Sequence, residues 1–155
     1  MFYINEVGRW TQRTMNDANL HRWFQEAVSD IDNLADYIML VCEDYGPRPA
    51  FFEGDVRLTY GEWRDRSEAI ATHMRHKGVV PGDRVAVILP NGIAFPLATA
   101  AVLRLGCVQV NCSPLYTPRE LGHQLNDAGV KAAVLPATAL PTLIAAVPRD
   151  VEHAY

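Results

Sequence analysis

The segment RVAVIL at residues 84–89, with PNG directly after it at residues 90–92, sets the fold class that we predict for this chain. Its last five residues are all apolar, which is typical of a strand that is buried on both faces of a parallel sheet. The PNG sequence predicts a tight turn. The apolar residues 92–105 then predict a helix that ends at Gly106, because glycine is favoured directly after a helix.

The same alternation of strand and helix continues toward the C-terminus. Residues 107–110 and 131–135 predict two further strands. Between them, Thr117-Pro118-Arg119-Glu120 is a capping box with proline at the first helical position, so we predict a helix that runs to Ala128 and closes at Gly129. Residues 139–147 predict a short helix, and residues 151–155 predict the start of a fourth strand.

Helices and a hairpin are predicted on the amino-terminal side. Thr59 and Glu62 form another capping box, which predicts a helix that ends at Gly78. Residues 50–52 and 56–58 flank a glycine turn and predict a short hairpin. Apolar residues at steps of three and four, from position 20 to position 45, predict helices at 20–31 and 34–45, with one continuous helix as the alternative.

Strands that alternate with helices imply right-handed crossovers. We therefore predict a layered α/β fold, with a mostly parallel sheet, helices on both faces, a short N-terminal hairpin and a helical N-terminal extension. We divide the chain into a partly helical extension, residues 1–33, and a subdomain, residues 34–155. Because the chain stops where a strand begins, which leaves a sheet edge bare, we expect an incomplete subdomain that is truncated at its C-terminus.

The composition excludes several classes of protein. The net charge is −4, from 14 Lys and Arg against 18 Asp and Glu, so we expect neither a nucleic-acid surface nor attraction to an anionic membrane. The three cysteines have no CxxC spacing, which argues against a disulfide framework and a zinc site and favours reduced, packed thiols in a cytoplasmic protein. Residues 91–103 are too short to cross a bilayer and contain a proline, so we expect no transmembrane segment.

Residues that could carry chemistry are few and scattered. Neither of the glycine-rich phosphate-binding patterns, GxxxxGK[ST] and GxGxxG, occurs. His73 and His76 have a spacing that can share a metal, but basic neighbours and the lack of a third ligand favour a solvated helix face. Glu120 and His123 have the same spacing, and we interpret them as a surface pair.

The cysteines and asparagines at strand ends are interpreted as structural. We expect Cys107 to pack, and we expect Cys112 to be inert because nothing near it in sequence would lower the pKa of its thiol. Asn91 and Asn111 end two strands and favour turn capping over contact with a ligand channel. We therefore predict no catalytic, cofactor-binding or metal-binding residue in this chain.

Two motifs resemble those of the AMP-forming acyl-CoA synthetase family, which includes luciferases and peptide-synthetase adenylation domains. LTYGEW at residues 58–63 is similar to the first core motif, with Trp63 where leucine is usual. LRLGCV at residues 103–108 is similar to the second, with Leu105 in place of the common alanine. Between them, GDRVAV at residues 82–87 and LPN at residues 89–91 resemble the usual strand and turn of the family.

One further stretch narrows the resemblance. NCSPLYTPREL at residues 111–121, followed by HQLND at residues 123–127, is similar to bacterial long-chain fatty-acid–CoA ligases. The resemblance covers about residues 34–155, whereas residues 1–32 resemble nothing known to us. It implies an enzyme that uses ATP, Mg²⁺ and coenzyme A to convert a fatty acid, through an acyl-adenylate, into acyl-CoA, AMP and pyrophosphate.

In that family the phosphate loop, the ribose-binding acid and the catalytic lysine lie downstream of the matched motifs. We therefore expect this chain alone to bind no cofactor and to be inactive. Two alternatives remain: a ligase for another carboxylic acid, and a stand-alone, non-catalytic binding or interaction module. We also expect exposed apolar surface to promote association of copies, and a cytoplasmic location, with peripheral attachment to the inner membrane face as an alternative.

Overall fold

The structure is a computed structural model, and it describes residues 2–4, 10–12, 33–146 and 150–155. The chain divides into two compact units, Met1–Asn33 and Leu34–Tyr155. In the first unit, strands β1 (Phe2–Ile4) and β2 (Trp10–Gln12) pair antiparallel. This strand pair was not predicted. The helix predicted at 20–31 lies outside the described residues.

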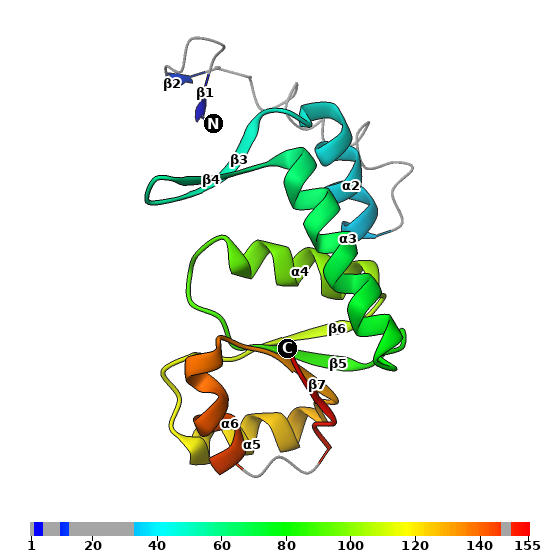
Figure 1. The fold of residues 1–155 in the computed structure, drawn as a ribbon, viewed down its shortest axis with the longest axis vertical. Coiled ribbons are helices and arrows are strands. Elements are labelled where there is room, and N and C mark those ends of the chain that lie inside the picture. Colours follow the sequence, from blue (N-terminus) through cyan, green and yellow to red (C-terminus); the bar gives the residue numbers. More distant parts are fainter. Residues whose placement is uncertain (1, 5–9, 13–32, 147–149) are drawn as a thin grey trace. The chain divides into compact units, whose positions relative to one another are not determined.

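The second unit begins with a helix, a hairpin and another helix (Figure 1). Helix α2 (Leu34–Tyr45) has the predicted bounds. Strands β3 (Pro49–Glu53) and β4 (Val56–Thr59) form the predicted antiparallel hairpin, whose turn contains Gly54 at a φ of 57°. Helix α3 (Tyr60–His76) begins at the predicted capping box of Thr59 and Glu62.

A four-stranded parallel sheet forms the centre of this unit. Its strands are β5 (Arg84–Val87), β6 (Val108–Asn111), β7 (Ala132–Val134) and β8 (His153–Ala154), in the spatial order β6-β5-β7-β8. Three observed strands are shorter than predicted: β5 ends at Val87, β7 spans three residues and β8 spans two. The predicted layered α/β fold with a parallel sheet is confirmed.

Helices cover both faces of the sheet. Helices α3 and α4 (Ala94–Arg104) pack with Val85 and Val87 on one face. Helices α5 (Pro118–Ala128) and α6 (Leu140–Ala145) pack with Ala86 and Ile88 on the other. The alternate side chains of β5 thus point to two cores, which is why nearly every residue in RVAVIL is apolar.

Two helices differ in detail from their predicted bounds. Helix α4 begins at Ala94, two residues after the predicted position 92. The helix predicted at 139–147 is preceded by a 3₁₀ turn, η1 (Ala137–Ala139), and α6 itself ends at Ala145. Among the described residues, none of the helices combines the length and apolar character that a bilayer crossing requires.

Candidate functional site at the carboxyl edge of the sheet

The order of the strands marks the place where a ligand site is expected. The chain runs from β5 to β6 on one side, and then returns past β5 to β7 and β8 on the other. Right-handed crossovers in opposite directions place α4 and α5 on opposite faces (Figure 1). Open parallel sheets bind ligands outside the carboxyl ends of their strands, at such a reversal. The turns after β5 and β7 therefore border the candidate site.

The turn after β5 is held by a residue from the β3–β4 hairpin. The Glu53 carboxylate accepts a hydrogen bond of 2.8 Å from the backbone N–H of Ile93, just before α4. A Cβ atom on Gly92 would lie 2.8 Å and 2.9 Å from the two oxygens of this carboxylate. Gly92 therefore permits the close approach of Glu53. A negative charge at the start of a helix is also favourable for the helix dipole.

This arrangement bears on phosphate binding. A helix N-terminus at the strand-order reversal is the usual place for a phosphate group in doubly wound folds. Here the Glu53 carboxylate already takes the Ile93 N–H, and its charge would repel an anion. The predicted interpretation of Pro90-Asn91-Gly92 as a turn and not a phosphate cradle is consistent with this geometry.

A second contact reaches the first turn of α4 from α3. The indole Nε1 of Trp63 donates a hydrogen bond of 2.9 Å to the carbonyl oxygen of Pro96. Phe51 of the hairpin lies against Trp63 with its ring edge-on, at 4.9 Å between ring centroids. The start of α4 is therefore bonded to two other elements: to the hairpin through Glu53 and to α3 through Trp63.

Asn111 is the last residue of β6, and Cys112 directly follows it. The Asn111 side chain accepts a hydrogen bond of 2.7 Å from the Gln109 amide, and its backbone carbonyl accepts one of 2.9 Å from the Gln124 amide. Asn111 is exposed and is bonded along its own strand and to α5. Asn91 is exposed in the turn after β5. The structure does not join the two asparagines to each other by a hydrogen bond.

The cysteine thiols are buried. Burial raises the pKa of the Cys112 thiol to about 11. Burial also raises the pKa of the Cys107 thiol, whose Sγ lies 3.3 Å from the carbonyl oxygen of Val80. All three cysteines are buried and free. A thiol with a raised pKa is a poor nucleophile at neutral pH, so the structural role predicted for Cys107 and Cys112 fits their surroundings.

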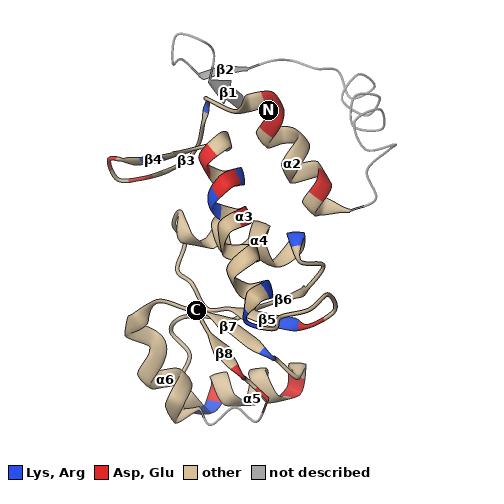
Figure 2. Cartoon of the chain, turned by 45° about the vertical axis from the view of Figure 1, so that its right-hand side comes forward, with Lys and Arg blue, Asp and Glu red and all other residues tan. Residues whose placement is uncertain are grey.

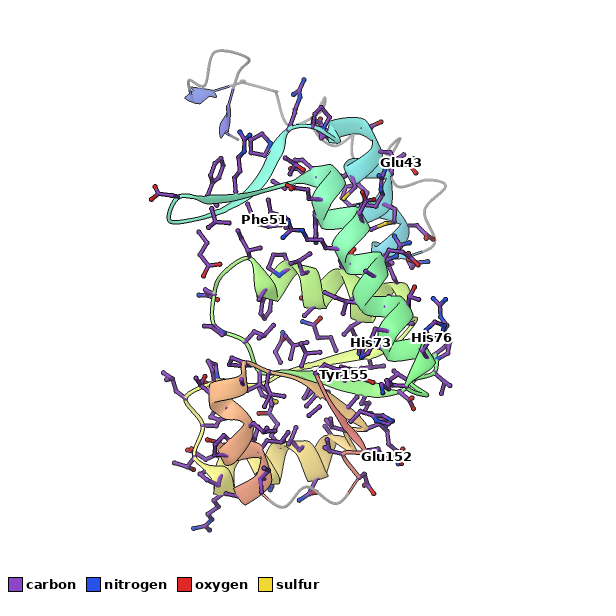
Figure 3. All side chains as sticks on the ribbon, in the orientation of Figure 1. Glu43, Phe51, His73, His76, Glu152 and Tyr155 are labelled. Carbon is purple, nitrogen blue, oxygen red and sulfur yellow. The ribbon has the colours of Figure 1, made fainter. Side chains whose placement is uncertain are left out.

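The candidate histidines lie near the C-terminal end of α3. His73 and His76 are exposed in its last turn, and the ring of His73 lies edge-on to Tyr155, 5.7 Å between centroids (Figure 3). Among the residues that the structure describes, no group of three or more His, Cys, Asp and Glu side chains is placed to hold a metal ion.

Glu120 and His123 lie at the start of α5, where they line a shallow depression together with Thr117 and Arg119. Both Glu120 and His123 are exposed, which agrees with the predicted surface pair. Hydrogen bonds from the backbone and the hydroxyl of Thr117 lower the pKa of the Glu120 carboxyl. Glu120 is therefore engaged in capping its helix.

Neither of the two contacts at the start of α4 was predicted from the sequence. Glu53 lies 40 positions before Ile93, and Trp63 lies 33 positions before Pro96, so no local pattern joins them. The glycine after Asn91 was the available signal, although it also fits an ordinary turn.

The charged residues of the helices do not form a patch of one sign. Figure 2 shows acidic and basic residues interleaved along α3, while α6 carries neither.

Comparisons with known proteins fit this architecture. The family described as "AMP-binding enzyme" matches residues 40–154. A long-chain-fatty-acid–CoA ligase of Escherichia coli O6:H1 is 44% identical over 92 residues, which is 59% of this chain and 16% of that protein. A salicylyl-CoA synthase / salicylate adenylyltransferase of a Streptomyces species is 36% identical over 131 residues, 84% of this chain and 20% of that protein.

A solved structure agrees with the sequence relatives. A fatty acyl CoA synthetase of Mycobacterium tuberculosis superimposes with a TM-score of 0.71 at 27% identity, over 79% of this chain and 26% of that one. The chain thus spans about a fifth or less of the length of the two curated relatives.

Proposed function

This chain belongs to the AMP-binding enzyme family, and from that premise we propose that it forms the N-terminal part of an ATP-dependent fatty-acyl-CoA ligase. In the proposed reaction, a fatty acid carboxylate attacks the α-phosphate of ATP, so that acyl-AMP forms and pyrophosphate leaves. The thiol of coenzyme A then attacks the acyl carbon, and acyl-CoA and AMP are released with one proton. ATP, Mg²⁺ and coenzyme A are proposed for the whole ligase.

The observation that carries this proposal is the 44% identity to a long-chain-fatty-acid–CoA ligase over 92 residues. The stretch at residues 111–127, which resembles the bacterial long-chain ligases, runs from Asn111, the carboxyl end of β6, through most of α5. A fatty-acyl substrate is supported further by the likeness to a fatty acyl CoA synthetase at a TM-score of 0.71.

We propose a scaffold role for this chain within the ligase. The described side chains at the carboxyl edge cap helices, close turns or pack in the core, and the candidate His, Cys and Glu residues make no hydrogen bonds with one another there. No catalytic, cofactor-binding or metal-binding residue is proposed among residues 34–155, the proposed subdomain. Residues 1–33 are proposed to be an extension outside it.

Acyl-CoA formation by the complete ligase that contains this chain tests the substrate. The panel comprises long-chain, medium-chain and aromatic carboxylic acids, each supplied with ATP, Mg²⁺ and coenzyme A. We expect the highest kcat/KM with a long-chain fatty acid. A preference for salicylate or benzoate would instead support the alternative of an aromatic-acid ligase, which the 36% identity to a salicylyl-CoA synthase favours.

Carboxylate-dependent ATP–pyrophosphate exchange by the 155-residue chain tests the scaffold role. We expect no exchange with any acid in the panel. Clear exchange would overturn the proposal that the catalytic groups lie elsewhere. If the complete protein also formed no adenylate and no acyl-CoA with any acid, a non-catalytic binding module would be the better description.

We also propose that copies of the 155-residue chain associate in solution, in the cytoplasm. Several large apolar side chains are exposed, among them Ile144 at 68% and Leu115 at 89%. Ile144 and Leu140 share one side of α6, which has no charged residue (Figure 2). Sedimentation velocity at increasing concentration should reveal species larger than a monomer, whereas a strictly monomeric chain would contradict this proposal.

A further inference from the structure

The side chain of Glu53 contacts the backbone at the start of α4. The carboxylate accepts from Ile93 N–H at 2.8 Å, and its two oxygens lie close enough to Gly92 to exclude a Cβ atom there. The turn at residues 90–92 and the hairpin are therefore in contact at a point where a side chain in place of Gly92 would require the Glu53 carboxylate to move. This places the end of β3 beside the start of α4, the helix that follows β5 along the chain.

Helix α4 lacks a cap of its own, which explains why a distant carboxylate is needed. The capping position is occupied by Ile93, whose side chain cannot accept a hydrogen bond. Pro96, in the first turn, has no backbone N–H. By contrast, α3 and α5 both carry local capping boxes. Glu53 thus supplies from the hairpin what Thr59 and Thr117 supply within their own helices.

A second set of contacts joins the hairpin to the start of α4, through Phe51 and Trp63. Phe51 lies two residues before Glu53 on β3, and its ring packs on Trp63, which in turn bonds the Pro96 carbonyl. The hairpin therefore reaches α4 directly through Glu53 and indirectly through Phe51 and Trp63. Two contacts of different chemistry, one polar and one aromatic, fix the same segment.

We propose that Glu53 is a positioning residue, which ties the β3–β4 hairpin to the turn at residues 90–92 and so fixes the carboxyl edge of β5 beside the substrate site. The inference rests on the proposed function, because the turn matters for catalysis only if a ligase site opens at this edge. Gly92 is the other residue on which this contact depends. Its missing side chain is what lets the carboxylate reach Ile93.

The first test measures amide exchange and thermal unfolding in the 155-residue chain. In Glu53→Ala we expect the Ile93 amide to exchange about tenfold faster, since a hydrogen bond to a charged group is lost. Glu53→Gln keeps an acceptor on a side chain of the same length, so its Ile93 exchange rate should lie between those of the parent chain and Glu53→Ala. Asp55→Asn is the matched control: it removes a carboxylate from the same hairpin turn and should leave Ile93 exchange unchanged.

Gly92→Ala completes a double-mutant cycle with Glu53→Ala. Alone, Gly92→Ala should displace the carboxylate and speed Ile93 exchange as much as Glu53→Ala does. Combined with Glu53→Ala, it should add nothing, because the atoms that the new methyl group would meet are gone. Additive effects, or an Ile93 amide that Glu53→Ala leaves unchanged, would overturn the proposed tie.

The second test measures kinetics in the complete ligase. Glu53→Ala should raise KM for the carboxylic acid or for coenzyme A severalfold while kcat changes less than about twofold. Asp55→Asn should match the parent enzyme, and Glu53→Gln should recover most of the loss. Unchanged KM in Glu53→Ala, in an enzyme whose parent is active, would show that the tie does not serve the site. An inactive parent would refute the proposed function, and the exchange rate of the Ile93 amide would then decide by itself whether the tie exists.

Discussion

The indole of Trp63 donates a hydrogen bond of 2.9 Å to the carbonyl oxygen of Pro96, and so joins α3 to the first turn of α4. Trp63 is also the position at which the first core motif departs from its usual leucine. Leucine has no donor, so this bond depends on the substitution that the motif carries here. The indole ring of Trp63 also packs against Phe51.

Replacement of Trp63 should therefore destabilise the chain in two separable steps. Trp63→Phe removes the N–H and keeps an aromatic ring, and we expect a loss of about 1 kcal/mol of unfolding free energy. Trp63→Leu also removes the ring contact with Phe51 and should cost about 1 kcal/mol more. Urea unfolding measures both. Phe52→Leu, at a side chain that is 62% exposed, is the control, and an equal loss there would refute the explanation.

Gly122 should tolerate no side chain. A Cβ atom at this position of α5 would lie 2.5 Å from the carbonyl oxygen of Ala146, which is backbone and cannot swing away. Gly122→Ala should lower the free energy of unfolding by about 1–3 kcal/mol, as overpacking does. In Gly46→Ala the added carbon would lie 3.8 Å from its nearest neighbour, an ordinary contact, so stability should hold or rise slightly. Urea unfolding of both variants measures this difference: the midpoint should fall in Gly122→Ala and not in Gly46→Ala.

The capping box at α5 should make stability depend on pH. The Thr117 hydrogen bonds lower the folded-state pKa of Glu120 below the ordinary value of a glutamate carboxyl. The unfolded state then binds the proton more readily, so the stabilisation is complete above that ordinary value and is lost as pH falls through it toward the folded-state pKa. Thermal unfolding of Glu120→Gln should show a shallower acid dependence than the parent chain. Thr117→Val should produce a similar flattening, and a curve parallel to that of the parent would contradict the assignment.

Cysteine reactivity should reflect burial. The pKa of Cys112 is raised to about 11, and the pKa values of Cys42 and Cys107 are raised as well, chiefly because burial penalises the thiolate. Iodoacetamide at neutral pH should label the folded chain slowly at all three thiols and label all three quickly after denaturation. Rapid labelling of Cys112 in the folded chain, located by peptide mapping, would argue for a function at that thiol.

Local sequence patterns were enough to predict the helices and strands of the second unit and their alternation. The capping boxes at Thr59 and Thr117 and the glycine that closes α5 act over three or four residues, so their residue types specify the helix ends. The apolar run at residues 84–89 specified a strand buried on both faces, because its periodicity records which side chains leave water. The motifs at residues 58–63 and 103–108 pointed to the family.

The strand order β6-β5-β7-β8, the tie between Glu53 and Ile93, and the need for glycine at position 122 became known only from the tertiary structure. Each of these depends on segments that lie tens of residues apart and meet only after the layers have packed. They depend on which atoms come into contact, and a local sequence pattern does not indicate which distant residue will supply the contacting atom.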